Sequence, residues 1–166
     1  MANEKNDSVS KRLLDTFRAR GLTFAAAESC TGGLVNARLT SHAGSSDVVE
    51  GGVVSYSNNV KMRLLGVKEE TLSCFGAVSE ETAREMAEGV KRATGADIAV
   101  SVTGIAGPGG GTEKKPVGTV CFGVATDSMT KTITQHFGSE LSRDGIRRLA
   151  SDYALTLATE AAENEA

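Results

Sequence analysis

Residues 28–33, with the sequence ESCTGG, are the strongest candidate for chemistry in this chain. They follow a short run of apolar and small residues, 23–27, that predicts a buried strand, and Thr31 is a residue type that caps helices. A strand-to-helix turn in an α/β domain presents side chains at the carboxyl edge of the sheet. We therefore expect Ser29 to offer its hydroxyl there as a nucleophile. A structural turn serine followed by two tightly packed glycines would fit the same residues.

The backbone of this segment offers a second kind of chemistry. Gly32 and Gly33 carry no side chains, so we expect the N–H groups of Cys30 to Gly33, at the helix start, to be open to an oxyanion or a phosphate. Cys30 is a rival nucleophile, but a thiol needs a partner that lowers its pKa, and no histidine is near it in sequence. A cysteine more commonly fills the core, so it ranks behind Ser29.

A lysine lies about thirty positions further on, in SYSNNVK, residues 55–61. A strand ends near Tyr56, and a helical turn that begins at Asn58 presents Lys61. A lone lysine on a short helix is normally solvated. If the fold buries Lys61 against Ser29, however, the amine loses its proton more easily and can act as a base. Hydrolases that use such a pair need no histidine, and this chain has only two.

The third segment is TGIAGPGGG, residues 103–111, which follows a predicted buried strand at 97–102. It resembles a phosphate-binding loop in composition but lacks the spacing of the nucleotide-binding glycine motifs. We expect Thr103, Gly104 and Gly107 to lie at the same sheet edge as Ser29. A surface loop without a ligand would also fit.

Three arginines stand at the start of the last predicted helix. Arg143 could clamp a phosphate or carboxylate beside the glycine-rich loop, whereas Arg147 and Arg148 are assigned to a solvated face. The sequence shows no paired carboxylates and no CxxC, so we expect no metal ion and no cofactor.

Composition limits the classes of function. The 166 residues are 40% hydrophobic and 23% charged, which is typical of a globular domain. Eighteen Lys and Arg against 21 Asp and Glu give a net charge of -3, which disfavours nucleic acid as a partner. No apolar run approaches the ~18 residues of a membrane span, and the first twenty residues lack a signal-peptide pattern. We expect a cytoplasmic protein without a membrane partner.

Helical and strand patterns alternate along most of the chain, and two consecutive strands follow late. This order predicts a single α/β domain, a three-layer α/β/α sandwich with a mixed, mostly parallel sheet. Residues 1–7 are interpreted as a disordered polar terminus and residues 8–166 as the domain. The predicted helices cover 8–21, 31–44, 58–65, 68–74, 79–95 and 146–158, and the predicted strands cover 23–27, 48–56, 97–102, 117–125 and 131–137.

Taken in order, ESCTGG, GGVVSYSNNVKMRLLGV, GAVSEETAREMAEG and SVTGIAGPGGGTEKKPVGTV resemble the C-terminal domain of the CinA (competence/damage-inducible protein) family. The similarity extends from about Val9 to Leu157. That family includes nicotinamide-nucleotide amidohydrolases, also called NMN deamidases. The resemblance implies a three-layer α/β fold and hydrolysis of the carboxamide of nicotinamide mononucleotide to nicotinate mononucleotide and ammonia.

The resemblance also implies roles for individual residues. Ser29 would be the nucleophile, Lys61 the general base and Tyr56 their support, with the mononucleotide as substrate. It further implies a homo-oligomer. Two alternatives stay open: a nucleotide- or partner-binding module without catalysis, and an amidase for another small carboxamide. The residues expected to bind substrate are Cys30, Thr31, Gly32, Gly33, Asn58, Thr103, Gly104, Gly107 and Arg143.

Overall fold

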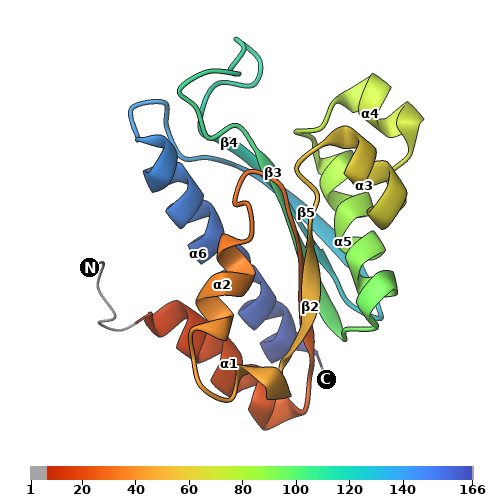
Figure 1. Cartoon of the computed structure of the whole chain (residues 1–166), viewed down its shortest axis with the longest axis vertical. Coiled ribbons are helices and arrows are strands. Elements are labelled where there is room, and N and C mark those ends of the chain that lie inside the picture. Colours follow the sequence, from red (N-terminus) through yellow and green to blue (C-terminus); the bar gives the residue numbers. More distant parts are fainter. Residues whose placement is uncertain (1–6, 166) are drawn as a thin grey trace.

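A computed structural model describes residues 7–165 of the chain, which form one α/β domain around a five-stranded sheet (Figure 1). The strand order is β2-β1-β3-β4-β5. β1 is parallel to β2 and to β3, whereas β4 is antiparallel to β3 and to β5. The strands are β1 (Phe24–Glu28), β2 (Val49–Val54), β3 (Ile98–Gly104), β4 (Thr119–Ala125) and β5 (Thr130–His136).

The sheet is mixed, as expected, but the prediction that it is mostly parallel is wrong, because only two of its four strand pairs are parallel. The difference arises at the glycine-rich loop. Residues 105–118 return the chain directly to the neighbouring position without a crossover helix, and this connection makes β4 antiparallel to β3.

Helices cover both faces of the sheet, which confirms the three layers (Figure 1). On one face, Phe17 and Ile146 belong to a large apolar core, and on the other, Leu65 and Met86 belong to a smaller one. No helix within residues 7–165 has the length and apolar character needed to cross a membrane. The first face carries α1 (Ser8–Arg20), α2 (Leu34–Thr40) and α6 (Arg143–Asn164). The second face carries α3 (Asn58–Leu65), α4 (Glu69–Phe75) and α5 (Glu80–Thr94). A 3-10 turn, η1 (Ser45–Asp47), precedes β2.

Two predicted boundaries are corrected. Thr31 does not cap α2, which begins at Leu34 after two further residues of turn. Asp7, assigned to the disordered terminus, instead caps α1 by accepting a hydrogen bond from the Ser10 N–H group, and it pairs with Arg38. The rest of that predicted terminus, residues 1–6, lies outside the described residues.

Candidate active site

Ser29 and Lys61 lie in contact at the carboxyl edge of the sheet. Ser29 immediately follows β1 and Lys61 is on α3, 32 positions later, yet Nζ is 3.1 Å from Oγ. The Ser55 N–H group donates to the carbonyl of Glu28, which holds the end of β2 beside the end of β1. Ser57 then caps α3 and starts the turn that carries Lys61 inward. The predicted proximity of the two side chains is therefore a structural fact.

The amine of Lys61 is buried, with 1% of the residue exposed. It lies 2.8 Å from the carbonyl oxygen of Ser55 and 3.5 Å from that of Tyr56. Among residues 7–165, no carboxylate forms a salt bridge with it. Burial lowers the pKa of Lys61, because the charged form loses its hydration. Nζ is within hydrogen-bond distance of two carbonyl oxygens and one hydroxyl, and in its neutral form it can donate to both carbonyls and accept from the hydroxyl.

The turn after Ser29 uses its glycine amides internally. The Gly32 N–H group donates to the carbonyl of Ser29, and the Gly33 N–H group donates to the carboxylate of Glu28. The expectation that these two amides are open to a ligand is therefore wrong. Within the described part of the chain, the N–H groups of Cys30 and Thr31 donate to no backbone carbonyl, and that of Cys30 is near its own thiol. Those two amides are the candidate donors to an oxyanion.

Glu28 occupies the position where a phosphate was expected. Its side chain is fully buried and accepts hydrogen bonds of 3.0–3.1 Å from the N–H groups of Gly33, Val35 and Asn36. A carboxylate already neutralises the positive end of α2, and a second anion there would meet like charge. The carboxylate therefore disfavours a phosphate at this helix start, which was one of the two ligands expected there. An acidic residue shortly before a helix was the sequence signal that could have identified this cap.

Cys30 is buried beside Ser29 with 6% exposure. Burial raises the pKa of its thiol to about 12, so the reactive thiolate is scarce at neutral pH. This environment favours Ser29 over Cys30 as the nucleophile.

Arg143 connects three segments around the site. One guanidinium nitrogen donates to the carbonyl of Gly107 at 2.7 Å, and another donates to the Tyr56 hydroxyl at 3.0 Å. Tyr56 is 61% exposed, and its hydrogen bond with Lys61 is made by its main-chain carbonyl. Of the expected binding residues, Arg143 and Gly107 are thus brought together with Tyr56.

Other expected residues are held by contacts within the protein. The hydroxyl of Thr103 donates to the carbonyl of Ala77 at 2.7 Å. Gly104 packs so closely on β4 that a Cβ atom there would lie 2.7 Å from the Val120 side chain. Asn58 is exposed at the start of α3. A direct contact of these three residues with substrate stays a prediction.

Arg147 reaches the turn that follows Ser29. Its Nε donates to the carbonyl of Cys30 and its Nη2 to the carbonyl of Thr31, both at 3.1 Å. The assignment of Arg147 to a solvated face is wrong, whereas Arg148 is exposed and pairs with Asp144. The signal for Arg147 was its spacing of four residues from Arg143, which places both side chains on one face of α6.

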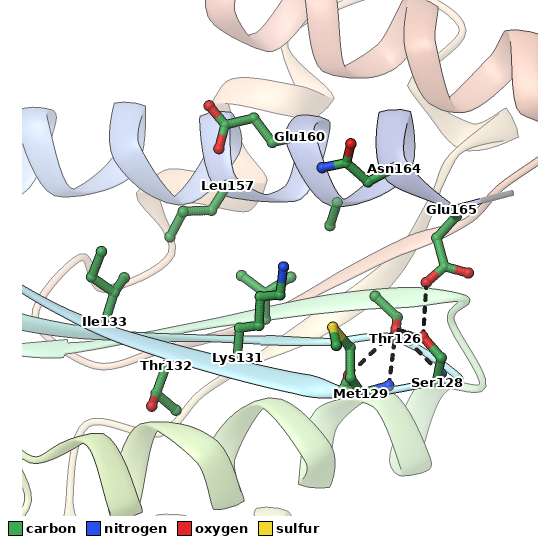
Figure 2. Close-up of a pocket in the computed structure, with 12 residues that line it drawn as sticks. Thr126, Ser128, Met129, Lys131, Thr132, Ile133, Leu157, Glu160, Asn164 and Glu165 are labelled. Atoms are coloured by element: carbon green, nitrogen blue, oxygen red, sulfur yellow. Dashed lines mark hydrogen bonds between the residues drawn. The ribbon is translucent and has the colours of Figure 1, made fainter.

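A pocket of about 460 Å³ lies away from these residues, between β5 and the C-terminal half of α6 (Figure 2). Val124 in its wall pairs with Val100, whereas the active-site end of β3 pairs with the start of β4. The pocket is therefore near the opposite end of the sheet, and none of the predicted site residues lines it.

Comparison with known proteins agrees with this architecture. A competence/damage-inducible protein from Agrobacterium tumefaciens has 41% sequence identity and a TM-score of 0.93, over 99% of this chain and 100% of that one. A CinA superfamily protein from Klebsiella pneumoniae has 33% identity and a TM-score of 0.90, over 95% and 98% of the two chains.

Curated relatives are longer. A CinA-like protein from Kosmotoga olearia is 48% identical over 149 residues, which are 90% of this chain but 36% of the relative. One from Chloroherpeton thalassium is 61% identical over 120 residues, 72% of this chain and 29% of the relative. The chain thus spans about a third of the length of the curated relatives it matches. The family model described as "CinA C-terminal domain" matches residues 6–162. With nearly the whole chain covered by that match and the same fold in solved relatives, this protein belongs to the CinA C-terminal domain family.

Proposed function

We propose that the domain hydrolyses a small carboxamide, with Ser29 as nucleophile and Lys61 as general base. The observation that carries this proposal is the buried contact between Ser29 Oγ and Lys61 Nζ, where carbonyl groups surround an amine whose pKa is lowered by burial. Nicotinamide mononucleotide is the proposed substrate, because members of the resembling family deamidate it. The products are nicotinate mononucleotide and ammonia.

The first step is acyl transfer to the protein. Ser29 Oγ bonds to the carboxamide carbon while its proton moves to the lone pair of Lys61. The N–H groups of Cys30 and Thr31 donate to the oxygen that becomes negative. The ammonium formed on Lys61 is met by the carbonyl groups of Ser55 and Tyr56. Lys61 then gives its proton to the leaving nitrogen, the C–N bond breaks, and ammonia departs.

The second step returns the protein to its starting state. Water attacks the ester on Ser29, Lys61 takes the proton of the water, and the serine leaves with that proton as the carboxylic acid forms.

The negative end of the substrate is proposed to bind near Arg143. Two hydrogen bonds of its guanidinium go to Gly107 and Tyr56, and N–H donors remain for a phosphate. The Glu28 carboxylate disfavours binding of this phosphate at the start of α2, because the two negative charges would repel each other. We further propose that the protein works as a homo-oligomer without nucleic acid.

The test is ammonia release from nicotinamide mononucleotide and from a panel of simple carboxamides. The wild-type protein is expected to produce ammonia and nicotinate mononucleotide in equal amounts, and Ser29→Ala to be slower by about 10³-fold or more. Ser73→Ala, which changes an exposed serine, is the matched control. Tight binding of the mononucleotide without turnover would contradict the proposal and indicate a binding module without catalysis. Turnover of another carboxamide, but not of the mononucleotide, would show that the proposed substrate is wrong.

A further inference from the structure

The guanidinium of Arg147 holds two successive carbonyl groups of the turn that carries Ser29. These belong to Cys30 and Thr31, more than a hundred positions earlier in the chain. A planar guanidinium that binds two carbonyls at 3.1 Å fixes both position and orientation, which a single hydrogen bond does not.

Fixing a carbonyl also fixes an N–H group. Because the peptide unit is planar and trans, its C=O and N–H bonds point in opposite directions. The carbonyl of Cys30 shares its peptide unit with the Thr31 N–H group, which no hydrogen bond engages in the part of the chain described. The carbonyl of Thr31 shares its unit with the Gly32 N–H group, which closes the turn onto the Ser29 carbonyl.

We propose that Arg147 is a positioning residue for the oxyanion site of Ser29. By binding the outer side of the two peptide units, it aims the Thr31 N–H group away from itself and holds the turn closed. This role rests on the proposed function, because it matters only where a negative oxygen forms beside Ser29.

The charge of Arg147 supports the same role. A guanidinium on a carbonyl draws electron density from that peptide unit and makes its N–H group a stronger donor. Arg147, which is partly exposed, also places a positive charge near a turn that contains the buried carboxylate of Glu28. The negative charge of that carboxylate would repel the developing oxyanion. The positive charge of the guanidinium offsets this repulsion.

Gly32 fits this arrangement. Its φ of +58° is in the left-handed region, and a Cβ atom there would lie 3.6 Å from Nη2 of Arg147. The turn and the arginine therefore pack directly against one another. A carboxylate oxygen of Asp144 lies 4.0 Å from another guanidinium nitrogen of Arg147.

The test uses a fluorophosphonate, a reagent that needs no nicotinamide substrate. Ser29 Oγ bonds to phosphorus, the P–F bond breaks, the proton moves to Lys61, and fluoride leaves. The phosphoryl oxygen occupies the oxyanion site. The rate of labelling is measured by mass spectrometry of the Ser29 peptide in wild type, Arg147→Met, Arg147→Lys and Arg148→Met. Arg148 is the matched control, since it contacts Asp144 but not the turn.

We expect Arg147→Met to label Ser29 about 10–100-fold more slowly. Arg147→Lys should lie between that rate and the wild-type rate, because an ammonium keeps the charge but lacks the planar two-carbonyl geometry. Arg148→Met should stay within about twofold of wild type. With the carboxamide substrate, kcat is calculated per folded protein, with the folded fraction measured by circular dichroism, because loss of folded protein would by itself lower the apparent kcat at constant KM. On that basis Arg147→Met should lower kcat and leave KM within about twofold.

The outcomes separate the two proposals. Wild-type labelling together with an Arg147→Met rate within twofold of wild type overturns the role of Arg147 and leaves the nucleophile in place. Absence of labelling at Ser29 in folded wild-type protein overturns the proposed function, and the role of Arg147 with it. If Arg147→Met unfolds below the assay temperature, Arg147→Lys decides: a wild-type rate in that variant contradicts the proposal.

Discussion

The amine of Lys61 lies 2.8 Å from the carbonyl oxygen of Ser55, closer than the 3.1 Å that separates it from the hydroxyl of Ser29. The carbonyl accepts one N–H group of the amine and so aligns Nζ, and in the neutral form of the amine the lone pair is then available for the serine proton. The strand end and the first turn of α3 therefore determine how the base meets the nucleophile.

Replacing Lys61 by Met should remove activity while keeping a side chain of similar length in the buried position. We expect ammonia release to fall by about 10³-fold or more, because Ser29 loses the group that takes its proton. Lys68→Met is the control, since Lys68 is exposed at the start of α4. Turnover by Lys61→Met close to that of Lys68→Met would show that another group is the base.

Burial of Lys61 should make stability depend on pH. Its pKa is lowered in the folded protein, so between that value and about 10.4 the unfolded chain binds more protons at this residue than the folded one. The stability that wild type has relative to Lys61→Met should therefore rise with pH in that window and become constant above it. Urea unfolding of both proteins at several pH values up to 10 measures the difference. A difference that does not change with pH, or that falls as pH rises, would contradict a lowered pKa.

Replacing Glu28 by Gln should destabilise the domain. The fully buried carboxylate accepts three backbone N–H groups, and the amide that replaces it turns one acceptor oxygen into a donor that faces N–H groups. We expect a loss of about 1–3 kcal/mol in the free energy of unfolding, measured in urea. Glu50→Gln, at an exposed position of β2, is the control and should change the value by less than about 0.5 kcal/mol. Equal stability of the two variants would mean that Glu28 does not cap α2.

The three cysteines should react unequally. Cys74 is exposed, whereas burial raises the pKa of Cys30 to about 12 and also raises that of Cys121. Iodoacetamide at pH 8 is expected to label Cys74 alone in the folded protein and all three thiols in urea, as read by peptide mass spectrometry. Labelling of Cys30 in the folded protein at the rate of Cys74 would restore the thiol as a candidate nucleophile.

Local signals in the sequence were sufficient for most elements. The helix predicted at 58–65 is α3, which Gly66 ends in a left-handed conformation, and the helix predicted at 79–95 is α5, which Ser79 caps. The direction of β4 was harder to predict from the sequence. The glycine-rich loop before it, residues 105–118, is long enough either to cross over to a parallel strand or to return directly to an antiparallel one. The parallel fraction of the sheet was consequently overestimated.

A site residue was predictable where the same short segment shows both the end of a strand and a side chain of catalytic type. Ser29 and Lys61 have that property, since each stands at the end of a strand or in the first turn after one. Arg147 and Glu28 do not. The partners of Arg147 are more than a hundred positions away, and the role of Glu28 depends on a helix that begins three residues later than its predicted cap. The local patterns, an acidic residue before a helix and the spacing from Arg143, indicate where these two side chains lie but not which groups they bind.

The protonation state of Lys61 is the property on which the catalytic account depends most directly. It can be followed by NMR titration of lysines labelled with ¹⁵N or ¹³Cε, with Lys61 assigned by the signal missing from Lys61→Met. The account predicts a midpoint below the value of about 10.4 for a free lysine, with the neutral amine present in the pH range of activity. A midpoint at or above that value would contradict it, because a charged amine has no lone pair for the proton of Ser29.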